Sequence, residues 1–190
     1  MMVWRLLRIG GLLPLLAACS SVVPVSYYQL DQLPVTAVAP TDAKADLYIE
    51  PVQVAAYLNS NSLILQTSAV QLHKSNQHQW AEALDLQLQR SLVNTLGNEL
   101  PDWRVQTLQA TPQSCRLLVQ LDKFHGEQQG TVQLAGRYHL LCGDKVQSAA
   151  FANSQPQPAE GYPAMVSTLS SLWQQQIRQI AQTIQVPAQP

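Results

Sequence analysis

Residues 114–142 read SCRLLVQLDKFHGEQQGTVQLAGRYHLLC, and this stretch decides the fold. Apolar and polar residues alternate along residues 114–125 and again along residues 131–142, as they do in half-buried strands. Between them, residues 126–130 have the length and the glycines of a hairpin turn. The sequence therefore predicts two antiparallel strands joined by a short turn.

The two cysteines of this stretch indicate the register of the hairpin. Opposing Cys115 to Cys142 pairs every inward apolar residue across the strands, whereas a slip of one residue would expose that whole face. The pairs are Leu117 with Leu140, Val119 with Tyr138, and Leu121 with Gly136. The same register predicts that His125 and His139 lie on opposite faces and cannot share an ion.

The first nineteen residues, MMVWRLLRIGGLLPLLAAC, indicate export. Two arginines precede a short apolar run that is typical of a secretory signal and too short to span a bilayer as a helix. The run ends in Leu16-Ala17-Ala18-Cys19, which resembles the lipobox of bacterial lipoproteins. We expect residues 1–18 to be a signal peptide and Cys19 to carry the acyl chains. The alternative is an ordinary cleavage site beside a cysteine.

The lipid anchor predicts where the protein resides. Several acyl chains hold a protein on a bilayer almost irreversibly without any spanning segment. Ser20 follows the cysteine, and in the sorting rule of enteric-type bacteria an Asp there retains a lipoprotein in the inner membrane. We therefore expect an outer-membrane anchor on the periplasmic face. The tether, residues 20–26, reaches at most about 25 Å, so the domain is expected to lie close to the membrane.

Export also determines the state of the remaining cysteines. Cys19 is consumed by the lipid, which leaves Cys115 and Cys142 as a pair in an oxidising compartment. We expect these two residues to form a cross-strand disulfide. The alternative is two reduced, buried thiols.

Two amphipathic helices and several further strands are predicted around the hairpin. Apolar residues four apart from Trp80 to Leu100 predict a helix over residues 76–100, capped by Asn76 and ended by Pro101. A second apolar stripe predicts a helix over residues 163–184. Further strands are predicted at residues 27–30, 47–54, 62–70 and 145–152.

The expected fold is α+β, an antiparallel or mixed β-sheet with both amphipathic helices packed on one face. We assign residues 19–26 to the lipidated cysteine and its tether, residues 27–185 to a single domain, and residues 186–190 to a C-terminal tail.

Composition excludes several classes of function. The net charge is −1 and no Lys/Arg cluster exceeds two residues, which argues against nucleic-acid binding. The chain lacks a nucleophile elbow, a P-loop and a dinucleotide fingerprint. His73 and His78 have no carboxylate to complete a metal site, and Glu82 with Asp85 is most simply a solvated helix face. We predict no enzyme, no metal and no cofactor other than the lipid on Cys19.

Several motifs resemble one family. They are the lipobox, Tyr27-Tyr28-Gln29-Leu30, Ile49-Glu50-Pro51-Val52-Gln53-Val54 leading to Tyr57-Leu58, Gln79-Trp80-Ala81-Glu82-Ala83-Leu84, and Leu88-Gln89-Arg90. Together they resemble the PqiC-type lipoproteins of the paraquat-inducible membrane-integrity operon, which are ABC-type transport auxiliary lipoproteins. The most specific motif is Trp80-Ala81-Glu82. The family pattern there is Arg-Trp-Ala-Glu-Pro-Leu, and this chain has Gln79 and Ala83 at the Arg and Pro positions.

The resemblance implies a non-catalytic component of an MCE- or ABC-type system that carries phospholipid between membranes and maintains envelope integrity. The implied partners are a periplasmic MCE-domain protein and its inner-membrane permease. The alternative is a structural lipoprotein of another envelope machine, for outer-membrane protein or lipopolysaccharide assembly. Because MCE assemblies are ring-like, a homo-oligomer is a further expectation, although the sequence has no coiled-coil signature.

Three residues are candidate partner contacts. Tyr57, Leu58 and Trp103 lie beside turn residues, and aromatic side chains are over-represented among interface hot spots. We expect Tyr57→Ala or Trp103→Ala to weaken partner binding more than it lowers the melting temperature. For Trp103 the alternative is that it caps the core. Trp80 and Trp173, in contrast, fall on the apolar stripes of the predicted helices and are expected in the core.

Overall fold

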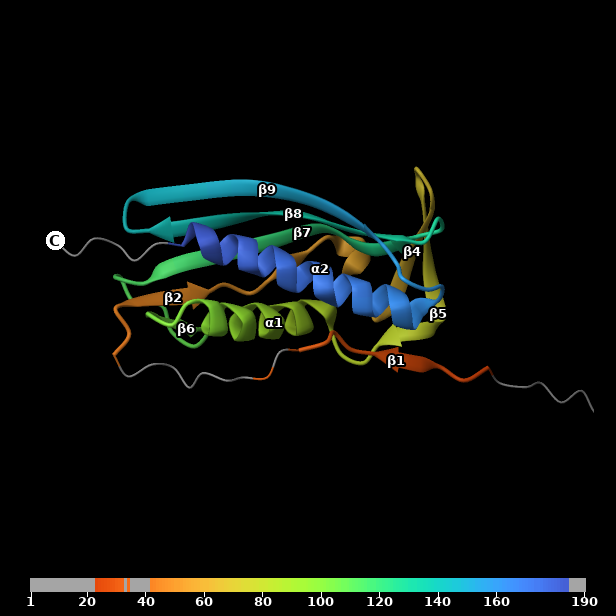
Figure 1. The fold of residues 1–190 in the computed structure, drawn as a ribbon, viewed down its shortest axis with the longest axis horizontal. Coiled ribbons are helices and arrows are strands. Elements are labelled where there is room, and N and C mark those ends of the chain that lie inside the picture. Colours follow the sequence, from red (N-terminus) through yellow and green to blue (C-terminus); the bar gives the residue numbers. More distant parts are fainter. Residues whose placement is uncertain (1–22, 33, 35–41, 185–190) are drawn as a thin grey trace, which may run out of the picture.

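The computed structural model describes residues 23–32, 34 and 42–184. Over these residues the chain forms a mixed sheet of nine strands, and two helices cover one of its faces (Figure 1). The predicted α+β class is confirmed. The signal peptide, Cys19 and residues 186–190 lie outside the described residues.

The elements alternate irregularly along the chain. The strands are β1 (Ser26–Tyr28), β2 (Ala45–Ile49), β3 (Gln53–Val54), β4 (Ser62–Ser68), β5 (Gln71–Trp80), β6 (Trp103–Gln106), β7 (Cys115–Glu127), β8 (Thr131–Cys142) and β9 (Lys145–Pro156). The helices are a 3₁₀ turn η1 (Ala56–Leu58), α1 (Leu84–Glu99) and α2 (Tyr162–Thr183).

Strand β7 is the centre of the sheet. One of its edges pairs antiparallel with β8, which pairs antiparallel with β9. Its other edge takes three short strands in succession, β2, β3 and β4, each parallel to β7. From there β2 continues to β6, and β4 continues to β5 and β1. The sheet therefore divides into two branches beyond β7.

The hairpin register follows the prediction up to Leu121. Leu117 lies opposite Leu140, and Leu121 lies opposite Gly136. The register then shifts at Asp122, so that Phe124 pairs with Leu134. This β-bulge reverses the alternation of β7 and turns Phe124 into the core, where an unbroken strand would have turned it outward.

The bulge also corrects the expected placement of two histidines. His125 pairs with Gln133, and both Gln133 and His139 are odd-numbered residues of the unbroken strand β8. His125 and His139 therefore lie on the same face of the sheet, not on opposite faces. They are nonetheless separated, because His139 pairs with Leu118 near the other end of the hairpin.

Cys115 and Cys142 are joined by a disulfide, with their Cα atoms 4.3 Å apart. The predicted cross-strand bond is confirmed. It ties the first residue of β7 to the last residue of β8, and so closes the open end of the hairpin.

Removing this bond by Cys115→Ala with Cys142→Ala is expected to lower the free energy of unfolding by about 2 to 5 kcal/mol, because unfolded chains lose the constraint of the closed loop. The loop spans 27 residues. Urea denaturation of both proteins, with peptide mapping of the parent under non-reducing conditions, measures this. Equal midpoints, or two free thiols in the periplasmic protein, would refute the stabilising role.

Helix α2 packs its apolar side against the sheet and against α1. Trp173 is fully buried, and its indole Nε1 donates a hydrogen bond to the carbonyl oxygen of Leu88, 3.3 Å away on α1. The buried apolar residues of α2 are Met165, Val166, Leu169, Leu172, Trp173, Ile177, Ile180 and Ala181. The second predicted helix is thus confirmed within a residue at each end.

The first predicted helix begins eight residues later than expected. Residues 71–80 form strand β5, and α1 starts at Leu84 after the cap residue Ala83, so Asn76 is not the cap. Trp80 is held in a strand because it pairs with Tyr28 of β1, whose carbonyl accepts a hydrogen bond from the Ala81 amide. Trp80 is still a core residue, and its ring lies 6.2 Å from that of Phe124.

Gly136 is required by the close approach of β7 and β8. A Cβ at this position would lie 2.2 Å from the backbone oxygen of Gln120, which cannot move without breaking the ladder. Gly136→Ala is therefore expected to cost about 1 to 3 kcal/mol of stability.

Gly97 of α1 is the control, because its Cβ would meet no atom within 4 Å. Gly97→Ala should stabilise by roughly 0.5 to 1 kcal/mol in the same thermal melts. A neutral Gly136→Ala would contradict this packing.

Candidate functional site

Tyr57 of η1 lies over the bulge of β7. Its hydroxyl donates a hydrogen bond to the carbonyl oxygen of Asp122, 2.9 Å away. Burial, followed by the negative charge of the Asp122 carboxylate, raises the pKa of Tyr57 to about 12. The phenol therefore stays protonated and holds η1 on the sheet, while its half-buried ring keeps one edge at the surface.

His125 lies beside the Tyr57 ring, with ring centroids 6.2 Å apart. It is buried, and its Nδ1 lies 3.1 Å from the carbonyl oxygen of Gly126. Burial lowers the pKa of His125, so that the ring is neutral near neutral pH. The neutral imidazole packs under η1. These surroundings agree with the sequence-based prediction that His125 has a structural role.

Leu58 and Trp103 are buried, whereas a residue that anchors a partner must be exposed. Their side chains are 2% and 3% exposed and belong to the hydrophobic core. Trp103 opens β6 and pairs with Ala45 of β2, whereas Tyr57 lies over the β7 bulge. The structure does not bring the three candidates together, and of them only Tyr57 presents part of its side chain to a partner.

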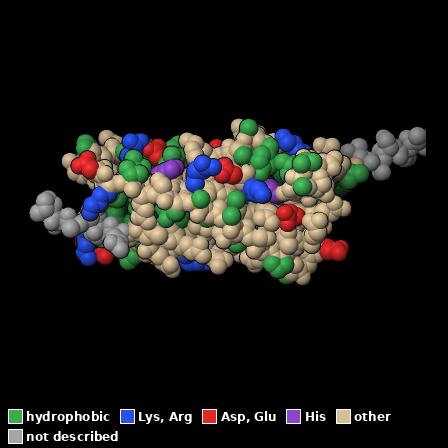
Figure 2. Space-filling view, turned by 90° about the horizontal axis from the view of Figure 1, so that it is seen from above, with side chains coloured by type: hydrophobic (Ala, Val, Ile, Leu, Met, Phe, Trp, Pro, Cys, Tyr) green, Lys and Arg blue, Asp and Glu red, His purple; other side chains and the backbone are tan. Residues whose placement is uncertain are grey.

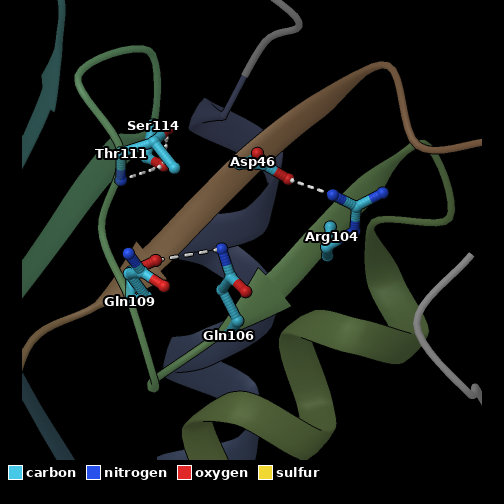
Figure 3. Close-up of polar contacts among 6 residues, drawn as sticks. All are labelled: Asp46, Arg104, Gln106, Gln109, Thr111 and Ser114. Carbon is cyan, nitrogen blue, oxygen red and sulfur yellow. Dashed lines mark hydrogen bonds and ion pairs between the residues drawn. The ribbon is translucent and has the colours of Figure 1, made fainter.

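The loop after β6 is held by polar contacts (Figure 3). Arg104 pairs with Asp46 across β6 and β2, with 3.3 Å between Nη1 and Oδ1. Gln106 donates from Nε2 to the carbonyl oxygen of Gln109 at 3.1 Å, and the Thr111 amide donates to the Ser114 hydroxyl at 3.0 Å. These contacts hold the loop of residues 107–114, which connects β6 to β7, in one conformation.

The sheet face opposite the helices, which we call the open face, carries paired charges. Alternate residues of β2, β7 and β8 point there, since their neighbours such as Leu47 and Leu117 are buried on the helix side. The pairs are Asp46 with Arg104, Glu50 with Arg116, and Asp122 with Arg137. Such partly exposed ion pairs contribute little to stability. Their balance makes the open face polar without a strong net charge.

A surface groove of about 790 Å³ lies where residues 28–32 cross the two helices. Its lining includes Asp31, Glu82, Arg90 and Ser170, and Arg90 is paired with Glu82. The crossing segment is fixed from both helices. The Gln87 side chain of α1 accepts a hydrogen bond from the Leu30 amide at 2.8 Å, and the Ser170 hydroxyl of α2 accepts one from the Asp31 amide at 3.1 Å. No sequence pattern predicts this groove, because it depends on how the segment after β1 packs.

Two further features bear on function. Within residues 23–32, 34 and 42–184, no three His, Cys, Asp or Glu side chains gather to hold a metal ion. In the same part of the chain, no helix combines the length and the apolar character needed to cross a membrane.

The sequence model of one protein family, described as the ABC-type transport auxiliary lipoprotein component, matches residues 28–181. The chain belongs to this family. Two relatives named intermembrane transport lipoprotein PqiC, from Escherichia coli (strain K12) and Shigella flexneri, are each 33% identical over 171 residues, covering 89% of this chain and 91% of theirs. The resemblance found in the motifs is confirmed.

Solved structures support the fold of this ABC-type transport auxiliary lipoprotein. A crystal structure of an uncharacterized protein is 32% identical, with a TM-score of 0.77 over 85% of this chain and 99% of that one. A Xanthomonas campestris protein at 14% identity has a TM-score of 0.64 over 82% and 92% of the two chains, and shows the fold alone. The family to which the chain belongs is one of transport auxiliary lipoproteins and not of known enzymes.

Proposed function

We propose that this protein is an outer-membrane lipoprotein on the periplasmic face that docks an MCE-domain protein of a phospholipid transport system, without catalysing a reaction. The observation that carries the proposal is the family match over residues 28–181. The intermembrane transport named for its relatives supports the same role.

The anchor is Cys19, the last residue of Leu16-Ala17-Ala18-Cys19. Ser20 favours outer-membrane sorting. Three residues separate Cys19 from Val23, so these two Cα atoms lie at most about 14 Å apart. An auxiliary component tied this closely cannot cross the periplasm alone, and the spanning element belongs to the MCE-domain partner and its inner-membrane permease.

The partner contact is proposed on the open face and its margin at Tyr57. Ion pairs such as Asp122 with Arg137 can exchange for pairs with a partner at little cost, because both side chains are half exposed. Tyr57 supplies the aromatic edge typical of hot spots. Leu58 and Trp103 support this surface from the core.

Affinity capture tests the proposal. The tagged, acylated protein is cross-linked in its own cells, purified from the outer membrane and analysed by mass spectrometry. Enrichment of an MCE-domain protein is expected. Tyr57→Ala removes the hydrogen bond that holds η1 on the sheet and so lowers the melting temperature, but it should reduce the enrichment by more than this loss of stability explains. Enrichment of outer-membrane protein or lipopolysaccharide assembly factors in its place would favour the alternative machine and overturn the proposal.

A further inference from the structure

The β4–β5 hairpin projects beyond the body of the sheet. Strand β4 pairs with β7 only at Leu65 and Gln66, which lie opposite the last two residues of β7. Past this point β4 and β5 have only each other as partners, and residues 68–74 are all exposed. Figure 1 shows the hairpin leaving the sheet at one end of the molecule. Because an isolated two-stranded hairpin is marginally stable in water, this projection needs a reason other than core packing.

The tip of this hairpin is apolar. Val70 is 96% exposed and Leu72 is 40% exposed. Strand β1 lies beside β5 in parallel, with Ser26 opposite His78. Its own Tyr27 and the preceding Val23 and Val25 are also apolar and exposed. Figure 2 shows apolar side chains at the end where the N-terminal trace leaves the molecule. Five exposed large apolar side chains thus belong to two segments that are hydrogen-bonded to each other.

The charge of the hairpin fits a lipid headgroup region. No Asp or Glu occurs between Glu50 and Glu82, whereas His73 and Lys74 are exposed next to the tip. Anionic lipids attract such cations at short range. The carboxylates of Glu127 and Glu160 lie near Leu65 at the base of the hairpin, so apolar contact at the tip is the main attraction and charge is the lesser one.

The strand that follows the tether, β1, is fixed to the domain. The hydroxyl of Tyr28 shares a hydrogen bond with Nδ1 of His78 at 2.9 Å, and the His78 ring stacks on Tyr162 of α2 with centroids 4.0 Å apart. The anchored chain therefore enters the body beside β5, at the end that carries the hairpin (Figure 1).

We infer that the tip of the β4–β5 hairpin, Val70 with Leu72, docks into the surface of the bilayer that holds the Cys19 anchor. The inference rests on the lipid anchor of the proposed function. Anchor and hairpin together fix the domain at two points, which stops it from turning about its tether. The end that carries the Cys115–Cys142 disulfide then points away from the membrane, toward a partner.

A fluorescent label at the tip tests this docking. Cys19 is acylated and Cys115 is bonded to Cys142, so Val70→Cys adds a single free thiol to the mature, acylated chain. The thiol is labelled with an NBD dye and the protein is reconstituted into phosphatidylethanolamine/phosphatidylglycerol vesicles. We expect the NBD emission to shift to the blue and to be quenched by lipids that carry a nitroxide on the acyl chain.

Leu108→Cys is the matched control. Leu108 is 94% exposed, apolar, and lies in the loop between β6 and β7 at the opposite end of the molecule. The dye there should show neither the shift nor the quenching. If the dye at position 70 stays as water-exposed as the dye at 108 while the protein is bound to vesicles, the docking is refuted and the anchor stands. If the chain carries no acyl group and does not bind vesicles, the anchor and the docking inference both fall.

Discussion

Replacing Cys19 by alanine is expected to abolish stable attachment to the outer membrane. Each acyl methylene that enters the bilayer contributes about 0.8 kcal/mol, so the three chains of a mature lipoprotein outweigh any contact that the folded domain makes. In residues 23–32, 34 and 42–184, no helix could replace the anchor by spanning the bilayer. The variant should accumulate as uncleaved or mislocalised protein, as fractionation and intact-mass measurement would show.

Ser20→Asp is the matched control for this change. It leaves the acylated cysteine intact but alters the residue that directs sorting, so the protein should remain lipidated and shift to the inner membrane. If Cys19→Ala still fractionates with outer membranes after stringent washing, the anchoring argument is wrong.

Trp173→Ala is expected to produce the largest loss of stability of any single change within the domain. The side chain is fully buried between α2 and α1, and truncating it leaves a cavity that the surrounding helices fill only in part. Such changes cost about 3 to 5 kcal/mol. For a chain of this size, the melting temperature should fall by roughly 6 to 20 °C.

Trp173→Phe separates packing from hydrogen bonding. It retains most of the aromatic volume but removes the indole donor to the Leu88 carbonyl, which already accepts a bond within α1. It should therefore cost much less than Trp173→Ala, about 1 to 2 kcal/mol. Thermal and urea unfolding of both variants measure the difference. Equal and small effects would show that α1 and α2 are not held together at this point.

The parts of the fold that could be predicted are those whose pattern repeats with one period. The hairpin around Cys115 and Cys142 was predictable because alternation and the cysteines indicate the same register. Helix α2 was predictable because its apolar stripe is continuous from Met165 to Ala181. The helix signal depends on residues close in sequence, and the hairpin signal depends on two strands joined by a single short turn.

The parts that were missed depend on distant contacts. Strand β5 is polar and mostly exposed, and the four-residue step from Trp80 to Leu84 continues the stripe of α1 backward across a strand–helix junction. The bulge at Asp122 has no local marker, since its reason is the need to bury Phe124. The pairing of β1 with β5, which made Trp80 a strand residue, joins positions about fifty residues apart.

The expected exposure of Trp103 was wrong for a related reason. Turn residues beside Trp103 suggested exposure, but pairing of β6 with β2 carries this side chain into the core. In contrast, Val70 lies in a short apolar pair within a polar stretch, and only the end of β7 at Glu127 shows that the hairpin projects. Val70 is exposed because β7 ends before it can pair with the outer part of β4.

Binding of the MCE-domain partner tests the central claim most directly. The acylated protein is reconstituted in vesicles, and the purified periplasmic part of an MCE-domain protein from the same organism is titrated onto them. We predict saturable binding that requires the lipoprotein and weakens with Tyr57→Ala, while Gly97→Ala, a change within α1, binds normally. An absence of binding to folded, vesicle-anchored protein would contradict the account.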